Sequence, residues 1–152
     1  MEFTIKGQIE IHYDGKVYEN HNSLTSDAKK IICHCLAGEN KYKLSVIRVL
    51  YTCDNDPDGF TRMALSQVST IAYQNNDTEL KLSALFQLEF GEGATSAKIK
   101  LLQLESWNVG INDPVPVGQP AVLGTFSQAD ISADEVITSS RRISINWIIK
   151  PQ

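Results

Sequence analysis

Apolar and polar residues alternate along the first stretch of the chain, from Phe3 to Tyr13. The positions of one phase are Ile5, Gly7, Ile9, Ile11 and Tyr13. A period of two residues over this length predicts a β-strand with one buried face. Asp14-Gly15 and then Lys16-Val17-Tyr18 follow, and an Asp-Gly pair is typical of a tight turn between two strands. The chain is therefore predicted to open with a β-hairpin over residues 3–18.

The next segment changes to a helical period. After Leu24, apolar residues recur at the spacing of one helix face, at Ala28, Ile31, Ile32, Cys35 and Leu36. Residues 20–27 are rich in side chains that cap helix N-termini, and Gly38 stands where a glycine commonly ends a helix. We therefore expect one amphipathic helix over about 24–37, with the face of Ile31, Ile32 and Leu36 packed on a sheet.

From Tyr42 onwards the pattern is that of strands separated by polar turns. Strand-like segments span 44–51, 66–74, 79–90, 95–107, 121–126 and 137–149. The alternation in 79–90 and in 95–107, where Ile99, Leu101 and Gln103 are in phase, predicts an antiparallel hairpin of these two segments. Near the end, Trp147 is in phase with three isoleucines, which predicts that it lies in the core.

Many short strands and one early helix favour a mainly β fold, an antiparallel β-sandwich. The 152 residues have the length of one domain, and a chain of that size buries roughly 70% of its unfolded surface. Residues 108–120 contain three prolines and two glycines, which exclude a central strand there. We therefore expect residues 1–152 to form a single β-sandwich domain with a Pro/Gly-rich loop or arm at 108–120.

Charge and hydropathy exclude some classes of partner. Eighteen acidic residues against fourteen basic ones give a net charge of −4, which argues against nucleic-acid binding. No apolar run approaches the ~18 residues that cross a bilayer, and the N-terminus lacks the basic and apolar regions of a signal peptide. We therefore expect no nucleic acid and no membrane among the partners.

The acidic segment 54–59 is the part of the chain most similar to a known ligand motif. Asp54, Asp56 and Asp58, followed by a glycine, match the first half of an EF-hand calcium loop. The match ends there, because the twelfth position is Leu65 rather than glutamate and the flanks are predicted strands. A solvated acidic turn explains the same residues. We therefore expect no cofactor, with a structural calcium ion as the alternative.

Residue types that carry catalysis are present, but not in a catalytic arrangement. None of the three histidines accompanies a nucleophile on a Gly-x-Ser-x-Gly turn. Cys33-His34-Cys35 is spaced too closely for a zinc site, and Gly91-Glu92-Gly93 places an acid where a phosphate would bind. We therefore predict a protein that is not an enzyme and has no catalytic residues. The alternative function is a carbohydrate-binding β-sandwich or receptor-binding module. Trp107, which ends a predicted strand, is then the candidate aromatic side chain on which a sugar ring would stack.

Five short sequence motifs follow one another along the chain. They are the strand Gly7-x-Ile9-x-Ile11, the hairpin Asp14-Gly15-Lys16-Val17, the helix start Asn22-x-Leu24-Thr25, then Gly124-Thr125-Phe126-Ser127 and the terminal Ile143-Ser144-Ile145-Asn146-Trp147-Ile148-Ile149. This order resembles small virion proteins of tailed bacteriophages, of the tail, collar or fibre-attachment type. The resemblance implies a non-enzymatic structural protein of the virion, in the tail, collar or head-to-tail region.

The resemblance also implies the partners. They are other virion proteins and copies of the same chain, so we expect a homo-oligomer in the assembled particle. The hairpin 3–18 and the segment 108–120 are the parts expected to meet neighbours, and prolines reduce the entropy lost when such an arm becomes ordered. A plain connecting loop on an isolated domain is the alternative. The candidate interface residues are Asp113, Pro114, Val115, Pro116 and Val117.

Overall fold

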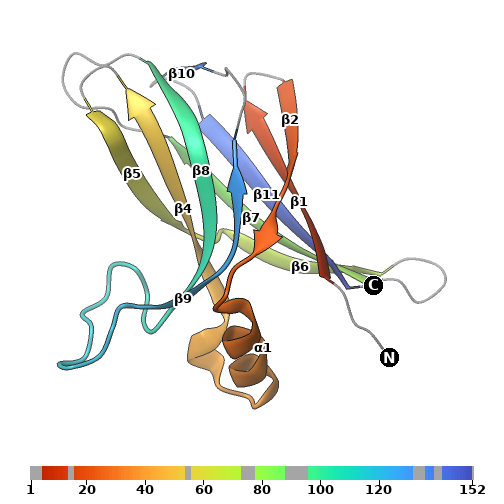
Figure 1. The fold of residues 1–152 in the computed structure, drawn as a ribbon, viewed down its shortest axis with the longest axis vertical. Helices are drawn as coiled ribbons and strands as arrows, with labels where there is room; N and C mark the ends of the chain where they lie inside the picture. Colours follow the sequence, from red (N-terminus) through yellow and green to blue (C-terminus); the bar gives the residue numbers. More distant parts are fainter. Residues whose placement is uncertain are drawn as a thin grey trace.

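The computed structural model describes residues 5–13, 16–53, 56–72, 78–87, 96–131, 136–138 and 142–151. The strands form two antiparallel sheets around a hydrophobic core (Figure 1), as expected for a sandwich-like fold. The first sheet has the order β2-β1-β11-β7-β6, with β1 (Ile5–Tyr13), β2 (Lys16–His21), β6 (Gln67–Ala72), β7 (Thr78–Gln87) and β11 (Arg142–Pro151). The second has the order β3-β9-β8-β4-β5, with β3 (Ser23–Leu24), β4 (Leu44–Cys53), β5 (Asp56–Ala64), β8 (Ser96–Trp107) and β9 (Val122–Asp130). A short strand, β10 (Val136–Thr138), also pairs with β8.

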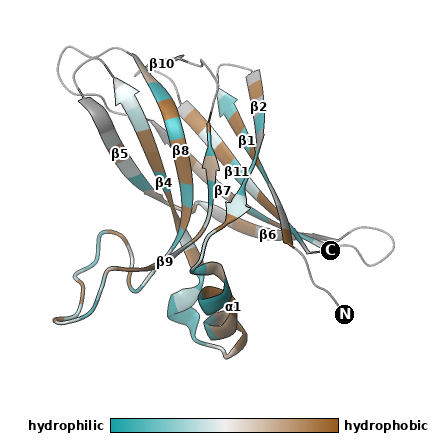
Figure 2. Ribbon diagram, viewed as in Figure 1, coloured by the Kyte–Doolittle hydropathy of each residue, from teal (hydrophilic) through white to brown (hydrophobic). Residues whose placement is uncertain are grey.

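The first sheet joins the two ends of the described chain. β1 pairs with β2 on one side, with Tyr13 opposite Lys16, which confirms the predicted hairpin; its turn, residues 14–15, lies outside the described residues. On its other side β1 pairs with β11, where Ile9 lies opposite Trp147. Both of these side chains have no exposed surface, so the prediction that Trp147 lies in the core is confirmed. Figure 2 shows the alternation behind this burial as hydrophobic and hydrophilic bands along the strands.

The predicted hairpin of 79–90 with 95–107 is wrong. β7 lies in the first sheet between β11 and β6, whereas β8 lies in the second sheet between β9 and β4. Apolar and polar residues alternate in both segments because each strand buries one face in the core. The two strands belong to different sheets and so face this core from opposite sides. Alternation identifies a buried face and leaves the neighbouring strand unspecified.

The predicted phase of the second half of β8 is also wrong. Leu102 and Leu104 are fully buried, while Leu101 and Gln103 are only half-buried. Opposite β4, Leu101 pairs with Leu50 and Ile99 pairs with Tyr51, so one residue of β8, Lys100, is extra. Such a β-bulge exchanges the two faces of the strand beyond it, and the sequence pattern gave no sign of it.

The helix α1 (Ala28–Leu36) is shorter than the predicted 24–37. It starts late because Ser23 and Leu24 pair with β9, and the Thr25 amide donates to the Phe126 carbonyl at 3.1 Å. Ala28 and Ile31 are buried, but Leu36 is 83% exposed, so the predicted burial of Leu36 is wrong. The end of the helix follows the prediction, since Gly38 adopts a positive φ of 84°.

A single turn of 3-10 helix, η1 (Asn40–Tyr42), leads from α1 into β4. The His34 ring stacks on Tyr42 with 3.9 Å between ring centroids, and the His34 imidazole also contacts the Glu39 carboxylate. These contacts join α1 to η1 at one end of the sandwich (Figure 1). Within the described ranges, neither α1 nor η1 has the length and apolar character that crossing a membrane requires.

Candidate functional site

The segment between β8 and β9, residues 108–121, contains no strand and extends from the end of the sandwich that carries α1 (Figure 1). Hydrogen bonds from Asn108 join the two ends of this segment, which we call its base. The Asn108 amide nitrogen donates to the Ala121 carbonyl at 2.9 Å, and its Nδ2 donates to Gln119 Oε1 at 2.7 Å and to the Pro120 carbonyl at 3.3 Å. The rest of the segment therefore projects from a fastened base.

The predicted interface residues lie in this projecting part. Asp113, Pro114, Pro116 and Val117 are exposed and Val115 is half-buried. The Asp113 amide donates to the Gly110 carbonyl at 2.9 Å, which forms a turn at the start of the projection. Val117 is fully exposed, and it is the most exposed of the large apolar side chains that the structure describes.

The acidic segment is more strand-like than predicted. Asp54 lies outside the described residues, while the backbone of Asp56 and Asp58 belongs to β5, with Asp56 opposite Cys53. The prediction of a turn over 54–59 is therefore wrong for residues 56–59, which belong to β5, and residues 54–55 lie outside the described residues. Within the described residues, no group of three or more His, Cys, Asp or Glu side chains is placed to hold a metal ion.

Gly59 has a different role from the predicted turn glycine. It lies within β5 opposite Tyr51 of β4, and a Cβ added at Gly59 would come within 2.5 Å of Tyr51 Cε2. The buried Tyr51 ring thus covers the glycine, and the absence of a side chain there is what makes room for the ring.

Trp107 lies at the end of β8, near two arginines and a phenylalanine. Arg62 lies 5.2 Å from the Trp107 ring and 5.4 Å from the Phe60 ring, and Arg48 lies 4.8 Å from Phe60. Trp107 is half-buried, whereas Phe60 is 52% exposed. We call Arg48, Phe60, Arg62 and Trp107 the aromatic–arginine patch.

Hydrogen bonds hold the patch in place. The Glu105 carboxylate, which is almost completely buried, accepts from Arg62 Nε at 2.9 Å and from Trp107 Nε1 at 3.2 Å. Arg48 Nη1 donates to Gln103 Oε1 at 3.1 Å. Only Trp107 of this patch was predicted from the sequence, because the other members come from β4 and β5 and meet it through strand register.

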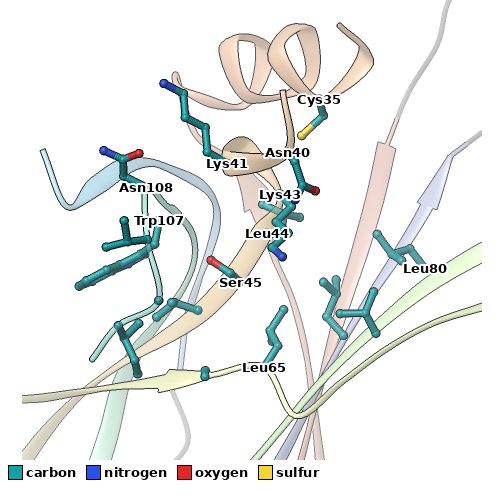
Figure 3. A pocket seen from close by; sticks show the side chains of 17 residues that line it. Cys35, Asn40, Lys41, Lys43, Leu44, Ser45, Leu65, Leu80, Trp107 and Asn108 are labelled. Atoms are coloured by element: carbon teal, nitrogen blue, oxygen red, sulfur yellow. The ribbon is translucent and has the colours of Figure 1, made fainter. Parts of the chain in front are cut away.

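A half-open pocket of about 920 Å³ lies at the same end of the sandwich as α1. It is lined by the ends of β4 to β7, by α1 and η1, and by Trp107 and the first residues of segment 108–121. Figure 3 shows Trp107 and Leu80 on opposite sides of it, with Leu44, Ser45 and Leu65 between them. Its apolar lining includes Leu44, Leu65, Val68, Leu80, Leu82 and Ile111.

Local irregularities shape the wall of this pocket. Opposite β8, Leu44 pairs with Ser106 and Val46 pairs with Glu105, so Ser45 is an extra residue in β4. The Ser45 carbonyl instead accepts from the Leu65 amide at 2.9 Å. Bulges of this kind redirect side chains and are common beside binding sites.

Cys35 contributes to the pocket from α1. Its Sγ donates to the Tyr42 carbonyl at 3.2 Å, and partial burial raises the pKa of the Cys35 thiol. Cys33, two residues earlier on the same helix, does not line the pocket, and both cysteines are classed as exposed. At neutral pH a thiol of raised pKa is neutral, so Cys35 acts here as a small, weakly polar wall residue.

Comparison of the chain with protein-family models, with curated proteins and with solved structures finds no match in any of the three. The pocket was missed by the sequence analysis, since its lining comes from segments spread between residues 35 and 111. No short motif joins these segments. The signal that was available is the excess of apolar residues at strand ends, such as Leu65 and Val68, where polar residues are usual.

Proposed function

We propose that the protein is a non-enzymatic structural component of a bacteriophage virion that works by protein–protein assembly in the tail, collar or head-to-tail region. The observation that carries this proposal is the projecting segment 108–121, fastened at its base by Asn108 and bearing a fully exposed Val117 at its far part. The resemblance in element order to small tail, collar and fibre-attachment proteins supports the choice of particle.

Contact with a second chain would stabilise segment 108–121. The sandwich core is closed without this segment, because the residues of the core cluster come from the strands, α1 and η1. A proline-rich segment loses little entropy on ordering, and burial of exposed apolar area yields about 25 cal/mol per Å². A neighbouring subunit is the natural source of that burial. The proposed partners are other virion proteins and copies of this chain in a homo-oligomer.

Site-specific photo-cross-linking tests this role. A photoreactive phenylalanine derivative placed at Val117 should capture a virion protein or a second copy of the chain in cells that produce the particle. The matched control is the same substitution at Leu85, which is exposed at 53% but lies in β7, away from the segment. Equal capture from both positions, or capture from neither, would count against an interface at 108–121.

A second candidate function rests on the aromatic–arginine patch. An exposed Phe60 ring between two guanidinium groups, with Trp107 beside it, offers stacking surfaces and hydrogen-bond donors of the kind that bind sugar rings. We propose as the alternative a carbohydrate-binding or receptor-binding module. Phe60→Ala and Trp107→Ala should then abolish retention on a glycan array while the fold is kept. An array on which the parent protein retains no glycan would eliminate this candidate.

A further inference from the structure

The pocket beneath η1 combines an apolar interior with charge of one sign. Among the described residues that line it are two lysines, Lys41 and Lys43, and no aspartate or glutamate. This contrasts with the whole chain, in which acidic residues outnumber basic ones by 18 to 14. A volume of about 920 Å³ falls in the range of roughly 300–1,000 Å³ that is typical of small-molecule sites.

The two lysines differ in direction. In Figure 3 Lys43 stands next to Leu44 at the pocket, whereas the Lys41 side chain points away from it, and both lysines are exposed. Lys41 also has a partner, since its Nζ lies 5.7 Å from the Tyr42 ring centroid. Lys43 has no carboxylate partner within the described part of the chain. A single unpaired ammonium thus stands beside an apolar hollow.

The apolar side chains around this ammonium are incompletely covered. Val68 is 57% exposed, although it pairs in register with the fully buried Leu82 and therefore lies on the inward-facing side of β6. Leu44, Leu65 and Leu80 are half-buried. An inward-facing valine that remains exposed marks space between the sheets that the chain does not fill.

From this combination we propose that the pocket binds a single-chain amphipathic carboxylate, such as a fatty acid. The alkyl chain lies among Leu44, Leu65, Val68 and Leu80, and the carboxylate lies at the Lys43 ammonium. A charge-assisted hydrogen bond fixes the head, and burial of methylene groups supplies the affinity. The pocket shares residues 108–111 with the start of segment 108–121 but none of the proposed interface residues 113–117, so ligand binding and the proposed function can fail separately.

Isothermal titration with chemically matched probes tests the proposal on the full chain. Dodecanoate, below its micelle concentration, should bind at one site. Decanoate should bind about fifteen-fold more weakly, because it lacks two methylene groups and each contributes about four-fold. Dodecyltrimethylammonium has the same chain and the opposite charge, and should show no saturable binding. Equal affinity for the anionic and cationic chains would overturn the proposal.

Two variants test whether dodecanoate binds in this pocket. Val68→Phe fills the hollow from an already exposed position and should weaken dodecanoate binding at least ten-fold; Val17→Phe, at a position 49% exposed on β2, is its matched control. Lys43→Gln removes the head contact and should also weaken binding about ten-fold; Lys30→Gln on α1 is its control. Parent-like binding by both pocket variants would overturn the proposal, whatever the controls show.

The cysteines of α1 provide a second readout that needs no mutation. Cys35 lines the pocket and Cys33 does not. Saturating dodecanoate should therefore slow modification of Cys35 by N-ethylmaleimide several-fold and leave Cys33 unchanged, as resolved by peptide mass spectrometry. Equal slowing of both cysteines, or of neither, would place the ligand elsewhere and contradict the proposal.

Discussion

Arg62 of β5 donates its Nε–H to Glu105 of β8 at 2.9 Å, although β4 lies between these two strands. The Glu105 side chain is 3% exposed and the Arg62 side chain 27% exposed. A carboxylate taken out of water to this degree needs an opposite charge or several hydrogen bonds to offset its desolvation. The ion pair holds Arg62 over the sheet, and this position brings the guanidinium to both Phe60 and Trp107.

Removal of this arginine should be strongly destabilising. We expect Arg62→Ala to lower the free energy of unfolding by about 3 kcal/mol, because among the described residues it leaves the buried Glu105 carboxylate with Trp107 as its one side-chain donor. Urea unfolding followed by circular dichroism measures this. The double variant Arg62→Ala/Glu105→Gln should recover part of the loss. The account of the patch is wrong if Arg62→Ala costs no more than Lys29→Ala, a charge removal on the exposed face of α1.

A side chain at Gly59 should also be costly. Gly59→Ala places a methyl group against the buried Tyr51 ring, and we expect a loss of about 1–3 kcal/mol in the free energy of unfolding. In a Tyr51→Leu background the same substitution should cost clearly less, since the obstructing ring is gone. A cost that is equal in both backgrounds would restore the simpler turn-glycine interpretation. Thermal and urea unfolding of the four proteins give this comparison.

The reactivity of Cys35 should depend on pH in a way that reports its burial. Its pKa is raised because the thiolate loses hydration, so the folded protein holds the thiol proton to a higher pH than the unfolded chain does. Iodoacetamide reacts with the thiolate; the rate at Cys35 should therefore rise at higher pH in the native protein than in urea. The same linkage makes the protein less stable as pH rises through the ordinary thiol pKa. Superimposable native and unfolded profiles would contradict it.

Calcium should leave the stability of the protein unchanged. The backbone of Asp56 and Asp58 is extended in β5, and an extended strand does not wrap oxygens around one ion as an EF-hand loop does. We therefore expect the melting temperature to be the same in excess calcium and in excess chelator. A calcium-dependent rise that Asp56→Asn and Asp58→Asn abolish would instead establish the alternative, a calcium site at Asp54, Asp56 and Asp58.

Sequence periodicity predicted which faces are buried better than which strands are neighbours. The hairpin of β1 and β2 and the buried position of Trp147 followed from a period of two and an Asp-Gly turn, both of which are local signals. The placement of β7 and β8 in different sheets depends on long-range pairing that no local pattern encodes. The same is true of the pairing of Leu24 with β9, which shortens α1 from its predicted start.

The candidate sites also differ in whether local sequence or long-range strand pairing determines them. The exposed segment around Val117 was predictable because prolines and glycines exclude a strand locally. Phe60, Arg48 and Arg62 were not, since their proximity to Trp107 is set by register across three strands. The pocket depends on the bulge at Ser45 and on the end of α1 meeting η1. Neither feature has a sequence signature.

The central claim is that the protein is part of a virion, and its location tests this most directly. An antiserum raised against the recombinant chain is used to probe a density gradient of lysate from the native source. The account predicts that the protein co-sediments with DNA-containing particles and resists a salt wash, after which immunogold microscopy assigns it to head, collar or tail. Signal confined to the soluble fractions, in a lysate that contains intact particles, would contradict the account.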